Sequence, residues 1–326
     1  MRSWLHNSVI VISLIFLGVI LYFVEWKLVY LKLSSLNFYE WVLSIAAQAL
    51  IFFFRARRYG AILPIQSSLR THALLNLAIV HSFYLTLLPA RLGDVYFAAL
   101  AQRYAGVSKS MGFSILLFVR LYDVIFLALL VLLLVSIYNT LILKQYIIYV
   151  VLVIISGFLM VVFFTRVLKI IISIFVFLEK ITNINACGVI ADNFFRVILE
   201  LSNNKSVFVH IFTFLLTALC WGCLIGIYWV LLTAFGVADA WLVALLLVVL
   251  SNLVLLIPIS TVGGLGVSEV VLTYGLMFTG MVFTEAVTIA ISLRIVILLI
   301  PIILALIWFS ANVFFQFGHS TVSGGD

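Results

Sequence analysis

Charged residues are scarce in this sequence. Only 9% of its 326 residues are charged, while 66% are hydrophobic; soluble domains have roughly 25% charged and roughly 45–50% apolar residues. So few charges cannot cover the surface of a soluble protein of this length, which excludes a soluble globular fold. The excess of apolar side chains needs lipid as a second solvent and indicates an integral membrane protein.

Cysteine is also scarce. Three cysteines are too few for a disulfide framework, and Cys220 and Cys223 lie in an apolar segment without a second pair of ligands, so we expect no metal site and no cofactor. The net charge of +7 does not indicate nucleic acid, because the basic residues are scattered or border apolar segments. We interpret them as orientation signals and lipid-headgroup contacts.

Six segments are long and apolar enough to cross a bilayer as α-helices. They are residues 8–24, 38–54, 112–138, 146–165, 207–235 and 285–312. The predicted fold class is therefore an all-α integral membrane protein with about six spanning helices. The first segment is expected to be a retained helix and not a signal peptide, because no small-residue cleavage site follows it.

Two further apolar segments, 72–105 and 240–282, are each broken near the middle. Proline removes a backbone donor and ends a helix, and glycine permits a reversal of the chain. The predicted breaks contain Pro89 and Gly93 in the first segment, and Pro258, Gly263, Gly264 and Gly266 in the second. Each segment is therefore predicted to form a pair of short helices.

The distribution of basic residues orients these segments. Arg55, Arg57, Arg58 and Arg70 mark the loop after the second helix as cytoplasmic, and the basic connection 166–206 lies on the same side. Between these two loops, the spans 112–138 and 146–165 already return the chain to its starting side, so the first broken segment must cross an even number of times. It is shorter than the roughly 40 residues that two full crossings need. We predict re-entrant hairpins that enter from opposite faces, with both termini in the cytoplasm.

The two halves of the chain share one outline: a helix, a broken hairpin and a second helix. We predict a single transmembrane domain whose repeats, about 38–138 and 207–312, are related by inversion, a pattern that points to a transporter site near the midplane. The alternative is a pair of long loops folded against helix ends without a ligand. The connection 166–206 is expected to lie as amphipathic helices on the cytoplasmic surface, and the tail 318–326 is expected to be disordered.

Ionisable residues inside predicted membrane segments are costly and indicate function. The chain has six: Arg91, Asp94, Arg120, Asp123, Glu269 and Arg294. We expect the three arginines and the half-helix N-termini to converge and bind anionic oxygen. Alternatively, Arg120 and Asp123 form a structural ion pair at i and i+3, and Glu269 caps its own half-helix or neutralises Arg294.

These residues also resemble a known family. Pro89-Ala90-Arg91-Leu92-Gly93-Asp94, Arg120-Leu121-Tyr122-Asp123, Gly263-Gly264-Leu265-Gly266-Val267-Ser268-Glu269 and Arg294 are similar to motifs of the flippase-like family typified by the membrane domain of lysylphosphatidylglycerol synthase. The resemblance extends from about residue 8 to 312. It implies translocation of phospholipids or polyprenyl-phosphate-linked sugars across the cytoplasmic membrane of bacteria and archaea. The soluble transferase domain of the synthases is not present in the sequence, so transferase activity is not expected.

The sequence thus predicts a lipid flippase or scramblase. A headgroup phosphate would be held by Arg91, Arg120 and Arg294, with the three acids supporting them or coupling protons. A membrane glycosyltransferase is the enzyme alternative, but no external loop offers the paired carboxylates it needs, so no catalytic residue is assigned. The other alternative is an accessory subunit that docks a partner enzyme at the cytoplasmic face; the oligomeric state is left open.

Overall fold

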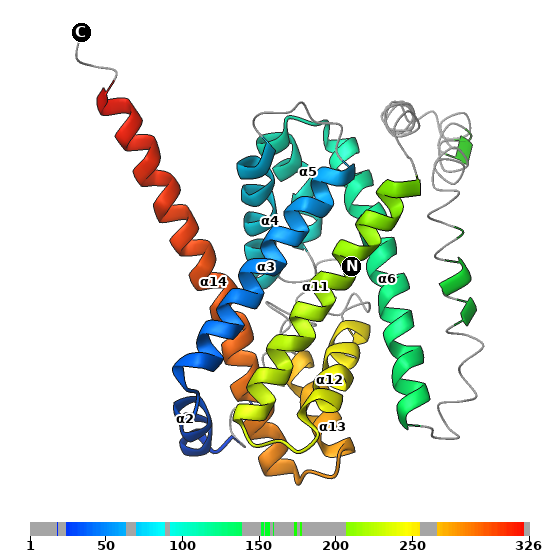
Figure 1. The fold of residues 1–326 in the computed structure, drawn as a ribbon, viewed down its shortest axis with the longest axis vertical. Coiled ribbons are helices and arrows are strands. Elements are labelled where there is room, and N and C mark those ends of the chain that lie inside the picture. Colours follow the sequence, from blue (N-terminus) through cyan, green and yellow to red (C-terminus); the bar gives the residue numbers. More distant parts are fainter. Residues whose placement is uncertain are drawn as a thin grey trace, which may run out of the picture. The chain divides into compact units, whose positions relative to one another are not determined.

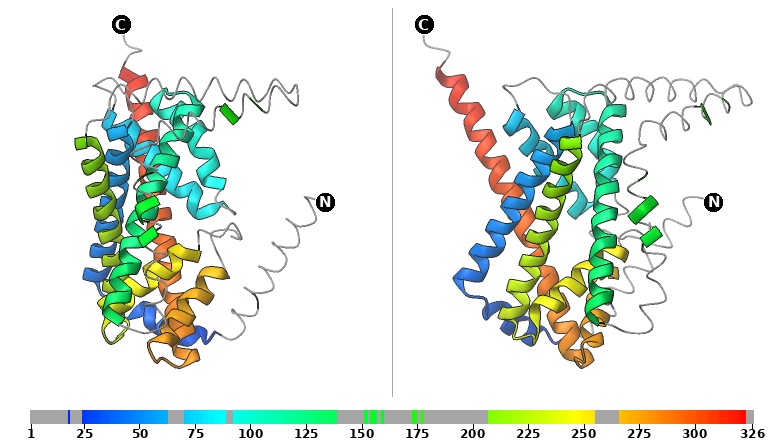
Figure 2. Two further views of the ribbon diagram at one scale, coloured as in Figure 1. Left: turned by 90° about the vertical axis from the view of Figure 1, so that its right-hand side faces the viewer. Right: turned by 45° about the vertical axis from the view of Figure 1, so that its right-hand side comes forward.

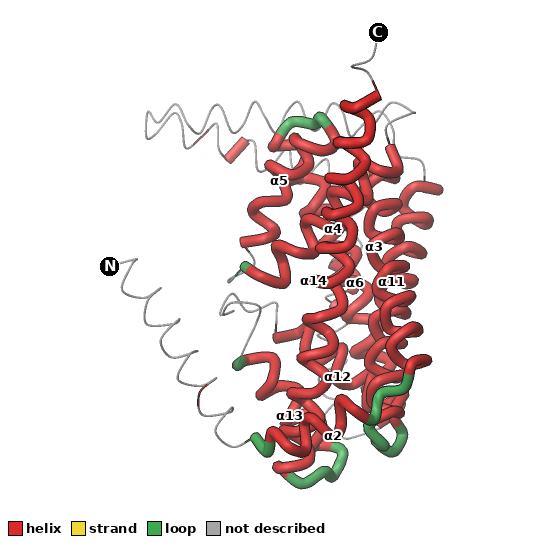
Figure 3. Tube along the Cα trace, turned by 90° about the vertical axis from the view of Figure 1, so that its left-hand side faces the viewer, coloured by secondary structure: helices red, strands yellow, loops and turns green. Residues whose placement is uncertain are grey.

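A computed structural model describes residues 24–62, 70–88, 92–138, 207–254 and 266–322, with Gly18 and a few positions between 151 and 177. All regular elements in these ranges are α-helices (Figure 3). The described residues belong to two compact units. Unit 1 consists of residues 1–50, 82–93 and 223–326, and unit 2 of residues 51–81 and 94–222.

Four of the helices are long and apolar enough to cross a membrane (Figure 1). They are α3 (Phe38–Ile62), α6 (Lys109–Tyr138), α11 (Val207–Ala234) and α14 (Phe283–Val322). They confirm the predicted spans at 38–54, 112–138, 207–235 and 285–312. The predicted spans at 8–24 and 146–165, and the connection 166–206, lie almost wholly outside the described residues.

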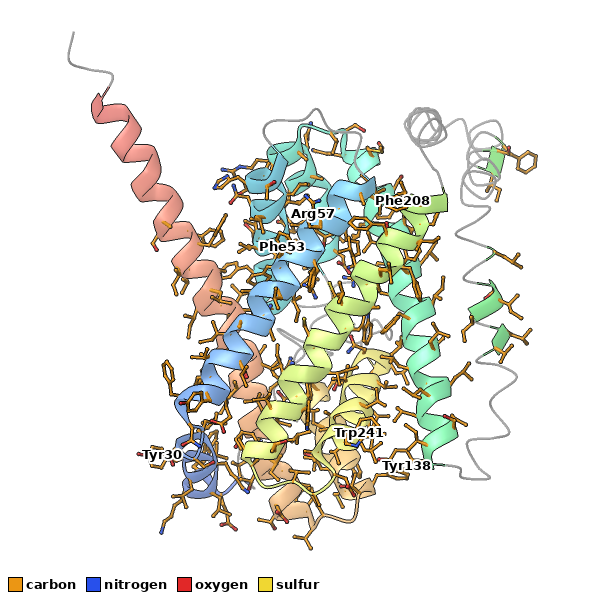
Figure 4. The ribbon with its side chains drawn as sticks, in the orientation of Figure 1. Tyr30, Phe53, Arg57, Tyr138, Phe208 and Trp241 are labelled. Atoms are coloured by element: carbon orange, nitrogen blue, oxygen red, sulfur yellow. The ribbon has the colours of Figure 1, made fainter. Side chains whose placement is uncertain are left out.

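The spanning helices present large apolar side chains on their outer faces. No more than half of the most apolar window of any of the four is buried, and Phe53 of α3 and Phe208 of α11 project outward from their helices (Figure 4). Exposed aromatic side chains of this size would be unfavourable in water. They are consistent with helices that face lipid.

Each broken segment forms two short helices, as predicted. The first contains α4 (Arg70–Leu87) and α5 (Leu92–Ala105), and the second contains α12 (Ala240–Val254) and α13 (Val267–Phe278). At about 1.5 Å per residue, the 15 residues of α12 and the 12 of α13 are too short for a hydrocarbon core of roughly 30 Å. Pro89, Pro258, Gly263 and Gly264 lie outside the described residues.

In unit 1, a short helix that the sequence did not predict supports the spanning helix α14. Helix α2 (Trp26–Ser34) contacts α14, which contacts α13, which in turn contacts α12 (Figure 2). Val29 of α2 is buried against Val287 and Ile291 of α14. Lys32 Nζ also donates a hydrogen bond of 2.5 Å to the carbonyl of Phe235, just after the end of α11, where a cation is favourable.

In unit 2, the N-terminal part of α6 packs closely on α5. A Cβ atom added at Gly112 would lie 2.8 Å from Cβ of Ala101 and 3.1 Å from Cα of Ala98. The ring of Phe97, on α5, lies 4.9 Å from that of Tyr59 on α3 and 4.8 Å from that of His81 on α4, measured between centroids. This aromatic contact fixes the three helices around the polar groups described below.

Two helix ends differ from the sequence prediction. Helix α3 continues past residue 54 to Ile62, because arginine is a good helix former and Tyr59 and Ile62 are buried. Arg55, Arg57 and Arg58 are therefore helical and do not form a loop. Helix α14 likewise continues to Val322, into the segment expected to be a disordered tail, since a single glycine costs a helix only about 1 kcal/mol.

Gly93 is predicted to tolerate no side chain. An added Cβ would lie 2.7 Å from the backbone nitrogen and 2.9 Å from Cα of Leu85, and backbone atoms cannot move aside as a side chain can. We expect Gly93→Ala to lower the free energy of unfolding by about 1–3 kcal/mol, measured by thermal unfolding in detergent. Gly222→Ala is the control, because nothing lies within 4 Å of its added Cβ; equal melting temperatures for the two variants would contradict the close packing.

Candidate functional site

The first polar cluster lies in unit 2 and is centred on Asp94. This residue is the third of α5, so its carboxylate is close to the free N–H groups of that helix, where negative charge is favoured. Its Oδ1 accepts a hydrogen bond of 2.6 Å from Nη2 of Arg120 on α6 and lies 3.1 Å from Nε2 of His81 on α4. One carboxylate oxygen therefore ties three helices together.

A second acid in the same cluster is held by a buried arginine. Nη1 of Arg58 donates to Oδ1 of Asp123 at 2.6 Å and to Oγ1 of Thr217 at 3.1 Å. Arg120 also reaches Asp123, with Nη1 3.4 Å from Oδ2. The side chain of Arg58 is 4% exposed and that of Arg120 is 34% exposed. Arg120 is therefore the arginine of this cluster that an outside ligand can reach.

A hydrogen-bonded chain leads from Asp94 into the core of unit 2. Nδ1 of His81 lies 3.0 Å from the hydroxyl of Tyr59, and Nε2 faces Asp94. Both His81 and Tyr59 are buried, and a buried polar group without a partner would be costly. The chain satisfies both groups and fixes the orientation of the Asp94 carboxylate.

The second polar cluster lies in unit 1 and is centred on Glu269. This residue is the third of α13 and is 3% exposed. Its Oε2 accepts a hydrogen bond of 2.5 Å from the backbone N–H of Gly266, and its Oε1 lies 3.3 Å from Nε of Arg294 on α14. Gly266 has a φ of +88°, which favours glycine. Glu269 thus caps its own helix and also pairs with Arg294.

The two clusters occupy matching positions on matching helices. Asp94 and Glu269 are each the third residue of their helix, and Arg120 and Arg294 are each the twelfth of α6 and α14. Tyr228 lies beside Ser251 and within electrostatic range of Arg294 and Glu269. In the first cluster, Tyr59 likewise lies beside His81 and within electrostatic range of Arg120 and Asp94. The matched pairs are Tyr59 with Tyr228 at position 22 of α3 and α11, and His81 with Ser251 at position 12 of α4 and α12.

The described residues place five of the six charged residues named from the sequence. The Arg120–Asp123 pair is present, but each partner makes a shorter contact to another helix, to Asp94 and to Arg58 respectively. Arg91 lies outside the described residues. The convergence of Arg91, Arg120 and Arg294 therefore stays a prediction.

Arg58 is a site residue for which the prediction from the sequence is wrong. The pattern of basic residues predicts that it marks a cytoplasmic loop with Arg55, Arg57 and Arg70, whereas it is buried in α3 and paired with Asp123. A signal was present in the sequence: Arg58 follows Ile51 by seven residues and precedes Ile62 by four, so it shares their helical face, and all three are buried.

The geometry suits recognition of anionic oxygen. A guanidinium offers several donors in a planar fork that matches a carboxylate or a phosphate, and Arg120 is both fixed by two acids and partly exposed. Among the described residues, no group of three histidine, cysteine or acidic side chains is placed to hold a metal ion.

The helices and their exposed apolar faces define a multi-pass α-helical membrane protein. The family model of the lysylphosphatidylglycerol synthase TM region matches residues 8–305, and the chain belongs to this family. The match confirms the resemblance read from the motifs. Neither a curated protein nor a solved structure matches the chain.

Proposed function

We propose that this protein translocates a phosphate-bearing lipid, either a phospholipid or a polyprenyl-phosphate-linked sugar, across the cytoplasmic membrane as a flippase or scramblase. The observation that carries the proposal is Arg120, a partly exposed arginine in an apolar spanning helix, held in place by Asp94 and Asp123. A charge at such a position is costly, so its presence indicates a function. Membership of the family supports lipid as the substrate class.

The matching clusters support an inverted repeat. Helices α3 to α6 and α11 to α14 carry a tyrosine, a second polar side chain, an acid and an arginine at the same positions. Paired, interrupted helices in two halves of a chain are typical of transporters that bind their substrate at the repeat interface. We propose that the two repeats alternate around such a site, with both termini in the cytoplasm.

The charge inventory fits a single phosphate. The three arginines and three acids predicted from the sequence carry charges that sum to zero when every acid is ionised. Arg58 raises the number of arginines to four against three acids, so one positive charge remains with every acid ionised. Proton coupling is therefore not required to attract an anionic headgroup.

Contacts of the carboxylates favour transport over catalysis. A general base must be available to take a proton from the substrate. Asp94 and Asp123 each accept from an arginine, and Glu269 accepts from Gly266 while it faces Arg294. We therefore propose no catalytic residue. Membrane lipids are the proposed partners.

Headgroup accessibility in proteoliposomes tests the proposal. A trace of fluorescent phosphatidylglycerol or polyprenyl phosphate is included, and the outer leaflet is quenched chemically. We expect the protected pool to shrink faster with the wild type than in empty liposomes, and Arg120→Ala and Arg294→Ala to slow this at least about 10-fold by removing charge-assisted contacts. A wild type that matches empty liposomes for both probes would overturn autonomous transport and favour an accessory subunit.

A further inference from the structure

The ion pair between Arg58 and Asp123 has no counterpart in the second cluster. Arg58 is residue 21 of α3 and Asp123 is residue 15 of α6, and the matching positions of α11 and α14 hold Ile227 and Ile297. Arg58 directly precedes Tyr59 as Ile227 precedes Tyr228, and Asp123 follows Arg120 by three residues as Ile297 follows Arg294. Two isoleucines can therefore occupy this place beside a tyrosine, an acid and an arginine.

Burial separates the pair from direct recognition of a ligand. The side chain of Arg58 is 4% exposed and that of Asp123 is 16% exposed, against 34% for Arg120. A buried ion pair is weak evidence for stability, because desolvation of two charges offsets most of their attraction. The matching positions of the second cluster hold isoleucines, so the contact between Glu269 and Arg294 forms without such a pair. Another role is required to explain the pair.

That role follows from the charges around Arg120. The four charged side chains linked by these ion pairs are two arginines and two aspartates, and their charges sum to zero. Arg55, on the same helix as Arg58, also acts electrostatically on Asp123. Without Arg58, the partly exposed Arg120 would lie between two carboxylates, and the group would carry one negative charge. Without Asp123 it would carry one positive charge. The pair therefore sets the potential that a headgroup meets at Arg120.

We propose that the Arg58–Asp123 pair is a specificity-determining element, which tunes the preference of the Arg120 site for anionic over zwitterionic lipid headgroups. The inference rests on the proposed function. Arg58 acts through Asp123 as a positioning residue and does not touch the lipid. A unit charge about 10 Å from the headgroup, at an effective dielectric constant of about 20, changes the preference roughly 10-fold.

The experiment compares two probes in the same proteoliposomes, phosphatidylglycerol and phosphatidylcholine with identical labelled tails. The readout is the ratio of their translocation rates, in which a loss of folded protein cancels. The variants are Arg58→Gln, Asp123→Asn and the double variant Arg58→Ile with Asp123→Ile, which copies the second cluster. Arg57→Gln is the matched control: it removes a positive charge one residue away, from an exposed position one helical turn from Phe53 (Figure 4).

We expect Arg58→Gln to lower the ratio roughly 10-fold and Asp123→Asn to raise it by a similar factor. The double variant restores the neutral sum and should return the ratio to within about twofold of the wild type, as should Arg57→Gln. A purely structural pair would change both rates equally. Ratios for both single variants within twofold of the wild type would therefore overturn the inference.

A second readout separates this inference from the proposed function. The same proteins in nanodiscs of zwitterionic lipid are titrated with both probes, and binding is followed by energy transfer from tryptophan. If the wild type binds the probes but translocates neither, the proposed function fails while the ratio of binding constants still tests the pair. If the ratios of binding constants rank the variants in the order expected for the translocation ratios, the inference is supported. Equal ratios for all variants, or no binding of either probe, overturn it.

Discussion

Asp94→Ala is expected to lower the free energy of unfolding by about 3–5 kcal/mol and to abolish lipid translocation. The carboxylate accepts from Arg120 at 2.6 Å and faces the imidazole of His81 at 3.1 Å. Its removal leaves a partly buried guanidinium with only the long contact to Asp123. It also breaks the hydrogen-bonded chain that begins at Tyr59.

The stability effect of Asp94→Ala is measured by unfolding in mixed micelles and its functional effect by leaflet quenching. Glu285→Ala is the control, since this acid in the first turn of α14 is exposed and its loss should cost less than about 1 kcal/mol. Asp94→Asn keeps the shape but not the charge and should fall between the two. Equal stability of Asp94→Ala and Glu285→Ala would contradict the role given to the carboxylate.

Glu269→Leu is expected to have the second largest effect, a loss of about 2–4 kcal/mol in the free energy of unfolding. Two interactions disappear together: the cap on the N–H of Gly266, at 2.5 Å, and the pair with Arg294, at 3.3 Å. The contact with Arg294 is longer than that between Asp94 and Arg120, so we expect the smaller loss of the two.

Glu269→Gln separates the cap from the charge. The amide oxygen can still accept from Gly266, but the side chain no longer balances Arg294, so stability should fall by about half as much as in Glu269→Leu. Translocation should fall as far as in Glu269→Leu, because both changes leave Arg294 unbalanced. If Glu269→Gln instead translocates like the wild type while Glu269→Leu does not, the acid serves only as a helix cap.

The sequence predicted the features that depend only on residues near one another along the chain. Hydropathy identified the four described spanning helices, since a lipid-facing helix must be apolar along its whole length. The interrupted segments were found because proline and glycine act on their own backbone. Six charged residues were identified because an ionisable side chain in an apolar segment indicates function. Five of them lie in the two described clusters.

Contacts between helices were not predictable in the same way. The i, i+3 spacing found the Arg120–Asp123 contact at 3.4 Å, but no spacing rule links residue 58 to residue 123. A high local density of arginine favoured a loop at 55–58, although the long arginine stem also suits a helix. Helix α2 was missed because its nine residues are too few for a span and include two lysines.

The most direct test of the central claim, that this protein moves lipids by recognising their phosphate, compares two labelled lipids that differ in the headgroup. Wild-type proteoliposomes receive either phosphatidylglycerol or glucosyl-diacylglycerol, which lacks a phosphate, and the rate of leaflet exchange is measured against empty liposomes. We predict accelerated exchange of the phosphate lipid, lost in Arg120→Ala, with little acceleration of the glycolipid. Equal acceleration of both lipids, or of neither, would contradict the account.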